Sequence, residues 1–577
     1  MSGTYKTLQG GTVSEHFPYN SVRTAQKDIL SSLDKIYAFG DKYRYIVIEA
    51  GTGIGKSAIA KAISEKEGNC YLLTATKQLQ DQYIKDFGNM GAKAVKGSVN
   101  YECSRDEGMP CSNGECKFTI GIYNECTLSG QCPYYNAKKE AESSEMYVTS
   151  YAYFLRISRK FQPGGDYHGK FTKRNAIIVD ECHMLEDQLL NCAGFTLSAK
   201  KMNERYMMNH GLDFKELCLY NRRLNDGEEE KNLEWVHLVD SIIMRKMMVI
   251  DKQIQCVKTG NRATMTADEL SELEDMDLMK LSNRKEELVR LHEKIRGYFL
   301  SENKDNWIMS VKDNVLSLKP IDVDGLFQKL INGWAERKVV FMSATILDKV
   351  GFCKDMGITP NETAFITRDG TFSSANSPIV YDPIGSMNYK NIGTTMPYVI
   401  EEVKRIMDMH PNEKGIIHTS TYNIAKQLTE AIDSDRFVVR EVGESNESLL
   451  KYHVTSDKPT VLVSPSLMAG VDLHDDLSRF QIIVKLPYIS LADERVKRKM
   501  NKNKKWYTCK MLRNLIQECG RSTRNDKDWS VTYILDNAFE TTMRYNKNML
   551  PKSFQNRIVN VNNFDVEEYE SRMKNAR

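Results

Sequence analysis

Residues 43–67 read YRYIVIEAGTGIGKSAIAKAISEKE, and this stretch decides the fold class. Its β-type run, its glycine-rich turn and its helical pattern follow one another in the order strand, loop, helix. In that context the backbone N–H groups of the loop can surround phosphates, Lys56 can reach the β and γ oxygens, and Ser57 can hold Mg²⁺. The alternative is a glycine turn with no ligand. The residues predicted to bind nucleotide are Gly51, Thr52, Gly53, Ile54, Gly55, Lys56 and Ser57.

Two series of short apolar runs alternate with helical stretches along the chain. The first series continues with CYLLTAT from Cys70, NAIIVD ending at Asp180 and KVVFMSAT ending at Thr345. The second series contains GIIHTS from Gly415, TVLVSPS, FQIIVKL and SVTYILD ending at Asp536. This alternation predicts an α/β protein with two units, each built on a parallel sheet that helices cover.

The composition is that of an ordinary globular protein. The chain has 577 residues, of which 41% are hydrophobic and 27% charged, so it has room for several domains and is not wholly disordered. Its 80 Lys and Arg against 77 Asp and Glu give a net charge of +3, so a nucleic acid would have to bind local basic patches. The start MSGTYKTLQGG lacks a signal-peptide pattern, and FQIIVKLPYISL is too short to cross a bilayer. We therefore expect a cytoplasmic protein without a membrane partner.

Two carboxylates follow the predicted strand NAIIVD. Asp180 ends this strand and Glu181 comes next, in the sequence VDECH. An acidic residue at the end of a strand near a phosphate loop can hold Mg²⁺, and its neighbour can orient or deprotonate an attacking water. The alternative is a solvated turn. The presence of the phosphate loop favours a site for hydrolysis of a nucleoside triphosphate.

The second α/β unit contributes the sequence QECGRSTR at residues 517–524. Its spacing of three and four residues places Gln517, Arg521 and Arg524 near one face of a helix. Guanidinium groups in this position could meet the γ-phosphate across a cleft between domains, as an arginine finger does. The alternative is a surface helix with two arginines.

The chain resembles superfamily two helicases of the XPD (xeroderma pigmentosum group D) and DinG type. The similar motifs, in order, are FPYNSVRTAQ, EAGTGIGKS, VDECHMLED, FMSATI, HTSTYN, LMAGVDL and QECGRSTR, and they span residues 17–536. The resemblance implies a 5′-to-3′ DNA translocase with two RecA-like motor domains, a helical arch and an iron-sulfur domain. It implies that Arg23 and Gln26 contact adenine and that Asp472 couples ATP to DNA. The DEAH box of the family has Ala where this chain has Cys182, a departure that leaves both carboxylates in place.

Five cysteines lie within residues 103–132, a density far above an even scatter of the thirteen in the chain. No Cys-x₂-Cys pair occurs, so irregularly spaced thiolates favour a [4Fe-4S] cluster, with zinc as the alternative. The flanks VKGSVNYEC and CPYY resemble those of the first and last cluster ligands of the family, which selects Cys103 and Cys132. Cys126 is the expected third ligand because its spacing to Cys132 resembles the DinG pattern. Between Cys111 and Cys116, we favour Cys116 as the fourth.

The expected domains follow from these motifs. Residues from about 197 to 310 are rich in Met, Leu and charge with almost no β-type runs, and Leu288, Leu291 and Ile295 have near-helical spacing, which predicts an all-helical insertion. We expect a first motor domain at 1–97, 146–196 and 311–375, an iron-sulfur domain at 98–145, a helical arch at 197–310 and a second motor domain at 376–577.

Two kinds of segment could contact nucleic acid. Residues 495–513 contain nine Lys or Arg and no acid, with Trp506 and Tyr507 among them, so they could follow a sugar-phosphate backbone and stack a base. The alternative is an ordinary basic helix or loop. Lys77, Gln78 and residues 419–421 resemble the strand-contacting motifs of the family.

The sequence therefore predicts an ATP-dependent DNA helicase that uses ATP, Mg²⁺ and a [4Fe-4S] cluster. The expected partners are single-stranded and forked DNA, and we expect a monomer. Two other hypotheses stay open at this stage. The first is a DNA-binding iron-sulfur redox sensor with slow ATP turnover, and the second is an ATP-driven remodeller that strips proteins from DNA without separating strands.

Overall fold

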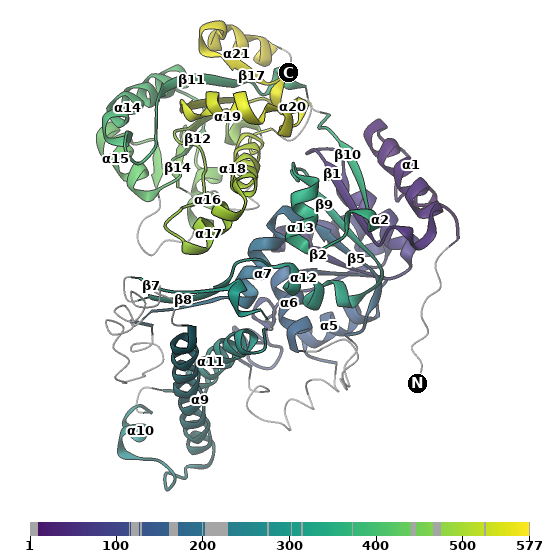
Figure 1. Ribbon diagram of the computed structural model, residues 1–577, viewed down its shortest axis with the longest axis vertical. Helices are drawn as coiled ribbons and strands as arrows, with labels where there is room; N and C mark the ends of the chain where they lie inside the picture. Colours follow the sequence, from purple (N-terminus) through teal and green to yellow (C-terminus); the bar gives the residue numbers. More distant parts are fainter. Residues whose placement is uncertain are drawn as a thin grey trace.

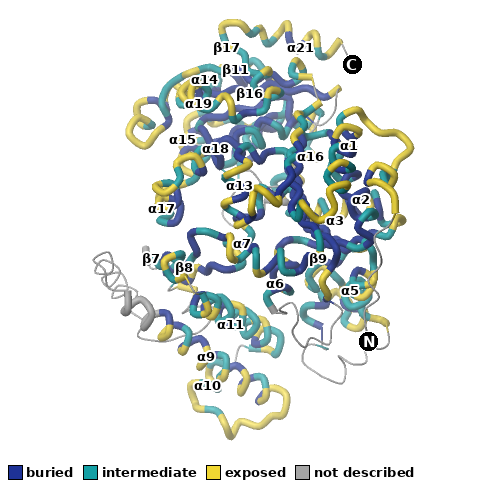
Figure 2. The backbone as a smooth tube through the Cα atoms, turned by 45° about the vertical axis from the view of Figure 1, so that its right-hand side comes forward, coloured by how far each residue is buried: buried dark blue, intermediate teal, exposed yellow. Residues whose placement is uncertain are grey.

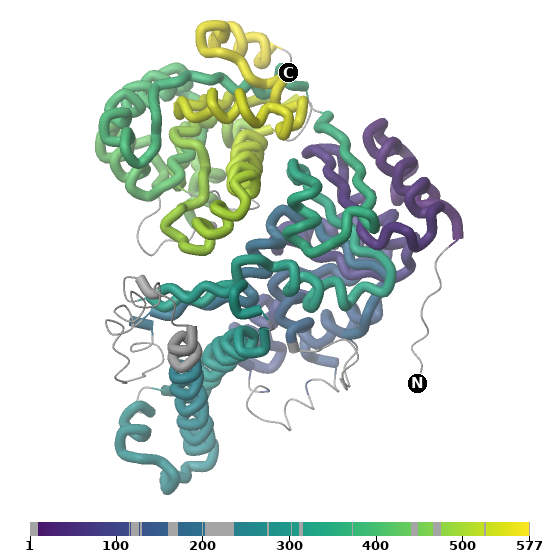
Figure 3. Tube along the Cα trace, in the orientation of Figure 1, coloured from purple at the N-terminus to yellow at the C-terminus, as the bar shows by residue number. Residues whose placement is uncertain are grey.

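The computed structural model of the protein describes most of the chain. It describes residues 10–575 except 115, 117–125, 127–129, 161–170, 199, 202–228, 274–275, 302, 313–314, 372, 440–445, 466–472, 474 and 524–526. The described residues form two lobes, each built on one sheet, and an elongated extension that leaves the first lobe (Figure 1). The colours of Figure 3 show that the second lobe is made of the last third of the chain, whereas the first lobe collects segments from before and after the extension.

The first lobe contains a parallel sheet of seven strands in the order β10-β1-β9-β5-β2-β4-β3. Alternate residues of β1 enter different cores: Val47 packs on one face of the sheet, and Ile46 and Ile48 pack on the other. The strands are β1 (Tyr45–Ala50), β2 (Cys70–Thr74), β3 (Ala92–Val95), β4 (Met146–Ser150), β5 (Arg174–Asp180), β9 (Ala335–Ser343) and β10 (Thr363–Arg368). The helices are α1 (Thr24–Ala38), α2 (Lys56–Glu67), α3 (Lys77–Phe87), α5 (Pro133–Ser143), α6 (Tyr151–Lys160), α7 (Leu185–Ala193), α12 (Asp324–Leu330) and α13 (Lys349–Met356).

The second lobe repeats this architecture with a parallel sheet in the order β13-β14-β12-β15-β16-β11-β17. Its strands are β11 (Ile379–Gly385), β12 (Gly415–His418), β13 (Phe437–Val439), β14 (Val461–Ser464), β15 (Phe480–Ile483), β16 (Val531–Asp536) and β17 (Ile558–Asn560). Its helices are α14 (Ile392–Met409), α15 (Tyr422–Ile432), α16 (Asn446–Thr455), α17 (Glu494–Lys502), α18 (Lys504–Cys519), α19 (Ala538–Asn546), α20 (Lys552–Gln555) and α21 (Val566–Asn575). Figure 2 shows buried strands at the centre of both lobes. Two parallel sheets with covering helices confirm the predicted fold class.

The extension corrects the prediction of an all-helical insertion. Its helices α9 (Glu229–Thr259), α10 (Ala267–Ser271) and α11 (Leu278–Phe299) lie where a helical segment was expected, and Leu288, Leu291 and Ile295 are buried in their common core. However, an antiparallel sheet in the order β6-β8-β7 forms the stem, with β6 (Phe195–Ser198), β7 (Trp307–Lys312) and β8 (Val315–Pro320). Along β8, partly buried and buried residues alternate, with Leu316 and Leu318 facing the core, as a half-buried strand requires.

Two other features of the described residues bear on the sequence predictions. No helix in the described ranges combines the length and the apolar character that crossing a membrane needs. The twelve cysteines in the described part of the chain are all free thiols.

Candidate functional site

The glycine-rich loop joins the end of β1 to the start of α2. Gly53 and Gly55 have φ angles of +82° and +88°, which glycine adopts without strain, and α2 begins directly after Gly55. A Cβ atom on Gly55 would lie 2.4 Å from the Nε2 atom of Gln26, so a side chain at this position would force the Gln26 amide to move. The Lys56 ammonium donates to the carbonyl of Ala50 at 3.2 Å. The loop therefore has the strand, turn and helix context that a phosphate-binding loop needs.

Two residues that the resemblance assigned to adenine lie against this loop. The Arg23 guanidinium donates to the carbonyl of Gly53 at 2.7 Å, and the backbone N–H of Arg23 donates to Oε1 of Gln26 at 3.0 Å. Gln26 is buried, and its Nε2 lies 3.5 Å from the carbonyl of Gly55. Arg23 and Gln26 thus brace the backbone of the loop from the start of α1.

The first carboxylate, Asp180, is buried at the end of β5. Its Oδ2 accepts a hydrogen bond from the Tyr83 hydroxyl at 3.0 Å, and its Oδ1 accepts one from the backbone N–H of Glu181 at 3.0 Å. Burial raises the pKa of Asp180 to about 6, and the charge of Glu181 adds to the rise, whereas the charge of Lys56 opposes it. Asp180 and Lys56 are therefore close enough to interact, as carboxylate and lysine around a shared Mg²⁺ and phosphate would be.

The second carboxylate, Glu181, begins a chain of contacts that leaves the phosphate loop. Glu181 has a φ of +53°, and its Oε2 lies 3.3 Å from Nδ1 of His183. The same ring nitrogen lies 2.9 Å from the hydroxyl of Ser343 at the end of β9. The Ser343 hydroxyl accepts the backbone N–H of Thr345 at 3.1 Å. His183 thus links the carboxylate pair to the segment Ser-Ala-Thr.

The chain of contacts continues into the second lobe. The side-chain amide of Gln517 donates to the Thr345 hydroxyl at 3.2 Å, and Arg513 donates to the carbonyl of Ile346 at 3.0 Å. On the side of the first lobe, Oε1 of Glu49 accepts the backbone N–H groups of Ile346 at 2.7 Å and Leu347 at 2.8 Å. The segment after β9 is therefore held from both lobes.

The structure describes only the first of the two arginines of QECGRSTR, Arg521. Arg521 follows the end of α18, near Glu518 and His418. Burial lowers the pKa of His418 to about 4, and the positive charge of Arg521 adds to this fall. The same charge favours the ionised form of Glu518. Burial outweighs this effect at Glu518 and raises the pKa of its carboxyl to about 8. Two predicted residues, Arg524 and Asp472, lie outside the described residues.

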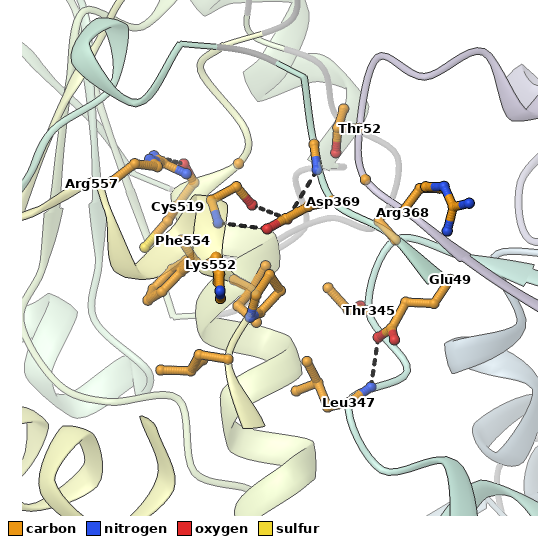
Figure 4. Close-up of a pocket in the computed structure, with 18 of the residues that line it drawn as sticks. Glu49, Thr52, Thr345, Leu347, Arg368, Asp369, Cys519, Lys552, Phe554 and Arg557 are labelled. Atoms are coloured by element: carbon orange, nitrogen blue, oxygen red, sulfur yellow. Dashed lines mark hydrogen bonds between the residues drawn. The ribbon is translucent and has the colours of Figure 1, made fainter. Parts of the chain in front are cut away.

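A cavity of about 400 Å³ lies between the lobes (Figure 4). The first lobe lines it with Gly51 and Thr52 of the loop and with residues 367–370, and the second lobe lines it with residues 548–554 and Arg557. The backbone N–H of Ser553 donates to Oδ2 of Asp369 at 2.8 Å, so the lobes also touch at the edge of the cavity. The predicted residues Lys56, Ser57 and Asp180 do not line the cavity, although the loop that carries Lys56 opens onto it.

Three of the five clustered cysteines approach one another at the start of α5. Burial raises the pKa of the Cys111 thiol to about 11, the thiols of Cys132 and Cys103 add to the rise, and a backbone hydrogen bond from Tyr134 opposes it. Cys132 is the residue that precedes α5, so thiolates here would face the positive end of a helix. A Cβ on Gly114 would lie 3.0 Å from Sγ of Cys103. Closely spaced, mostly buried thiols fit the donor set of a metal cluster.

The other two cysteines of the group have different surroundings. Cys126 is buried, and its sulfur lies 3.9 Å from a guanidinium nitrogen of Arg105, whereas Cys116 is partly exposed. Cys111, one of the two candidates for the fourth ligand, contacts Cys132.

The residues that resemble strand-contacting motifs lie in equivalent places on the two lobes. Lys77 and Gln78 are exposed in the first turn of α3, directly after β2. Thr421 is exposed at the start of α15, directly after β12, and its hydroxyl caps the helix by accepting the N–H of Ile424. Helix starts with exposed polar side chains are suited to phosphate groups.

The basic segment at 495–513 differs from the hypothesis that it stacks and tracks nucleic acid. Arg495, Lys499, Lys510 and Arg513 are buried, and Trp506 is only 3% exposed. These side chains face the first lobe, where carboxylates and backbone carbonyls bind them. The hypothesis is therefore wrong for Trp506 and for these four cations. The sequence signal for their burial was their spacing of three or four residues, which places them on the inward faces of α17 and α18.

Comparisons with known proteins agree with this architecture. Residues 20–212 match the family described as "Type III restriction enzyme, res subunit", and residues 403–557 match the family described as "Helicase C-terminal domain". A curated protein of Methanocaldococcus jannaschii named "Probable ATP-dependent helicase" is 23% identical over 256 residues, which are 38% of this chain and 37% of that protein. The chain thus matches little more than a third of the length of this relative.

Solved structures extend the similarity over nearly the whole chain. A structure named "XPD_Helicase" has a TM-score of 0.62 and 15% identity, and the alignment covers 94% of this chain and 100% of that one. Xpd4 of S. tokodaii has a TM-score of 0.54 and 14% identity, with 93% of this chain and 100% of that chain covered. Because the sequence identities are only 15% and 14%, these alignments show that the folds are similar. The predicted resemblance to the XPD type is therefore confirmed at that level: this chain has the fold of the XPD helicases, and its residues 403–557 match the helicase C-terminal domain family.

Proposed function

We propose that this protein is an ATP-dependent DNA helicase that moves 5′ to 3′ along single-stranded DNA and separates the strands of a duplex. The observation that carries the proposal is the continuous set of contacts from the carboxylate pair Asp180 and Glu181 to the second lobe, through His183, Ser343, Thr345 and Gln517. A motor needs such a connection, because ATP hydrolysis at one lobe must change the position of the other lobe relative to it.

The residues of the site have distinct roles in this proposal. The loop backbone and Lys56 would hold the phosphates of ATP, and Ser57 and Asp180 would hold Mg²⁺. Glu181 would orient the attacking water and accept its proton, while Arg521 and Arg524 would stabilise the negative charge that develops on the transferred phosphoryl group. The position of His183 beside Glu181 would let it report the state of the carboxylate to Ser343.

We further propose that the cysteine group holds a [4Fe-4S] cluster through Cys103, Cys126, Cys132 and a fourth thiolate. When bound, the cluster would cross-link the segments that carry its ligands and fix their mutual position. The sequence favours Cys116 as the fourth ligand, whereas the contact of Cys111 with Cys132 favours Cys111. Zinc is the competing metal for the same thiolates.

The DNA strand would run across the two lobes at the ends of their sheets. Lys77, Gln78 and Thr421 would contact phosphates, so binding would depend on the backbone of the strand and hardly on its base sequence. Tyr422, next to Thr421, is 63% exposed and could stack on a base.

The decisive experiment measures ATP hydrolysis with and without single-stranded DNA on anaerobically purified protein. We expect DNA to stimulate hydrolysis, Lys56→Ala to abolish it, and Glu181→Gln to retain ATP binding without turnover. Glu540→Gln, which changes an exposed carboxylate paired with Arg544, is the control and should behave as the parent does. Parental hydrolysis by Lys56→Ala or Glu181→Gln would refute the assignment of the site.

Substrate tests separate the rival functions. A redox sensor would show no stimulation by DNA, and a remodeller would hydrolyse ATP with DNA but leave a forked duplex intact. For a helicase of the proposed direction, we expect unwinding of a duplex with a 5′ single-stranded tail and little unwinding of one with only a 3′ tail. Equal unwinding of both substrates would refute the direction while leaving the ATP site in place.

A further inference from the structure

A buried ionic cluster joins the two lobes next to the carboxylate pair. The cluster consists of Glu186 at the start of α7 and of Arg495, Lys499, Trp506 and Lys510 on α17 and α18. Glu186 is 4% exposed, and it lies only five residues after Glu181 in the same turn-and-helix segment. We refer to these five residues as the Glu186 cluster.

Both oxygens of the Glu186 carboxylate bind side chains of the second lobe. Its Oε1 accepts hydrogen bonds from Arg495 at 2.7 Å and from Lys499 at 2.8 Å. Its Oε2 accepts the indole N–H of Trp506 at 3.2 Å and lies 3.0 Å from the ammonium of Lys510. The Trp506 ring also contacts Lys499, whose ammonium lies 4.9 Å from the ring centre. A single side chain of the first lobe thus binds four side chains of the second.

Each cation of the cluster is paired with carboxylates within the interface. Burial would favour the neutral form of Glu186, but its three cationic partners outweigh burial and hold its pKa well below the usual range. Lys499 lies 3.0 Å from Asp355 and 3.4 Å from Asp322, and Lys510 lies 3.2 Å from Asp187, so four carboxylates face the three cations. A complete buried network of this kind is tolerated, whereas removal of one member leaves the others without compensation.

One face of α18 runs from the Glu186 cluster to the nucleotide site. Trp506, Lys510, Arg513 and Gln517 are separated by four, three and four residues, so they lie on a single face of the helix. The first two bind Glu186, Arg513 binds the carbonyl of Ile346, and Gln517 binds the Thr345 hydroxyl. The helix is therefore fixed at its beginning by Glu186, and its later turns bind the segment after β9, which His183 links to the carboxylate pair.

From this arrangement we infer that Glu186 is a positioning residue: its carboxylate docks the start of α18 on α7 and thereby sets how Gln517 and Arg521 approach the bound triphosphate. The inference rests on the proposed ATP site and adds to it a residue that touches neither ATP nor Mg²⁺. Because Glu186 and Glu181 share one segment, a movement of the carboxylate pair is passed directly to the contact between the lobes.

The test compares Glu186→Gln and Trp506→Phe with the control Glu540→Gln in the full-length protein. Glu186→Gln removes the charge and keeps the shape, and Trp506→Phe removes only the N–H donor and keeps the aromatic packing. With saturating single-stranded DNA, we expect Glu186→Gln to lower kcat about tenfold and Trp506→Phe about threefold, while KM for ATP and the affinity for a non-hydrolysable ATP analogue stay within about twofold of the parent. A residue with only a structural role would not lower kcat selectively, because loss of folded protein would lower the number of nucleotide sites in the same proportion.

The outcomes distinguish this inference from the proposed function. If parental protein and Lys56→Ala hydrolyse ATP equally, the proposed function itself fails. If Lys56→Ala is inactive but folded Glu186→Gln has a kcat within twofold of the parent, or if its activity falls only as its nucleotide binding falls, the inference about Glu186 is refuted alone. Should Glu186→Gln not fold, Trp506→Phe and Lys510→Met decide by the same comparison of kcat with nucleotide affinity.

Discussion

Replacement of Gly55 by Ala tests the geometry of the phosphate loop at a single atom. Gly55 has a φ of +88°, a conformation that costs an alanine about 1 kcal/mol. The new Cβ would also lie 2.4 Å from Nε2 of Gln26. The Gln26 amide would have to move by about 1 Å to restore van der Waals contact, which would weaken its hydrogen bonds with the backbone of Arg23 and Gly55 by up to about 1 kcal/mol. We therefore expect Gly55→Ala to lower the free energy of unfolding by about 2 kcal/mol.

The matched control is Gly40→Ala in the same lobe. Gly40 also has a positive φ, +63°, but no atom lies within 4 Å of the position its Cβ would take. This variant isolates the cost of backbone strain, about 1 kcal/mol, from the collision with Gln26. Calorimetric unfolding of the full chain measures both, and equilibrium binding of ADP measures the loop directly, with at least about a tenfold loss expected for Gly55→Ala alone. If the two variants were equally stable and bound ADP equally well, the packing of Gln26 against the loop would be refuted.

Four further predictions concern protonation, metal and DNA. Burial raises the pKa of Asp180 to about 6. We therefore expect kcat/KM for ATP to fall as pH drops below about 6, because this proposed Mg²⁺ ligand becomes protonated, and a flat pH profile from 5 to 7 would contradict this. Burial raises the pKa of Glu518 to about 8, above its unfolded value, so the parent should lose stability relative to Glu518→Gln as pH rises from 5 to 9, by at most about 1.4 kcal/mol per pH unit; a constant difference would contradict this. Anaerobically purified protein should be brown and contain about four irons, and single replacement of Cys111 and of Cys116 should show that one of them is dispensable for iron; stoichiometric zinc without iron would contradict the cluster. Raising salt from 50 to 200 mM should weaken DNA stimulation at least about tenfold and basal hydrolysis much less, and stimulation indifferent to salt would argue against phosphate contacts.

The parts of the site that the sequence predicted are those encoded locally. The phosphate loop needs only a strand, glycines, a lysine and a helix in one stretch of residues 45–67, and the loop with Gly53 and Gly55 at positive φ has the expected form. The carboxylates follow β5 directly, and the period of the apolar runs sufficed for both parallel sheets.

The parts that sequence reasoning missed depend on residues far apart in the chain. The stem of the extension pairs β6 with β8, and more than a hundred residues separate these two strands. The basic segment at 495–513 resembled a surface for a polyanion because the carboxylate that binds its buried cations Arg495, Lys499 and Lys510, Glu186, lies more than three hundred positions earlier. Whether a charged side chain is neutralised depends on its contacts in the folded protein, and a count of cations along one segment does not reveal those contacts.

The position of Trp506 gives this protein a built-in optical reporter. The chain has five tryptophans, and Trp334 and Trp529 are buried within the cores of single lobes, whereas Trp506 is buried between the lobes against Glu186 and Lys499. Separation of the lobes would expose the indole of Trp506 to water and shift its fluorescence emission to longer wavelengths. The emission wavelengths of the tryptophans inside each lobe would not change. The difference spectrum between the parent and Trp506→Phe would therefore follow opening and closing of the interface during ATP turnover in real time, without an attached dye.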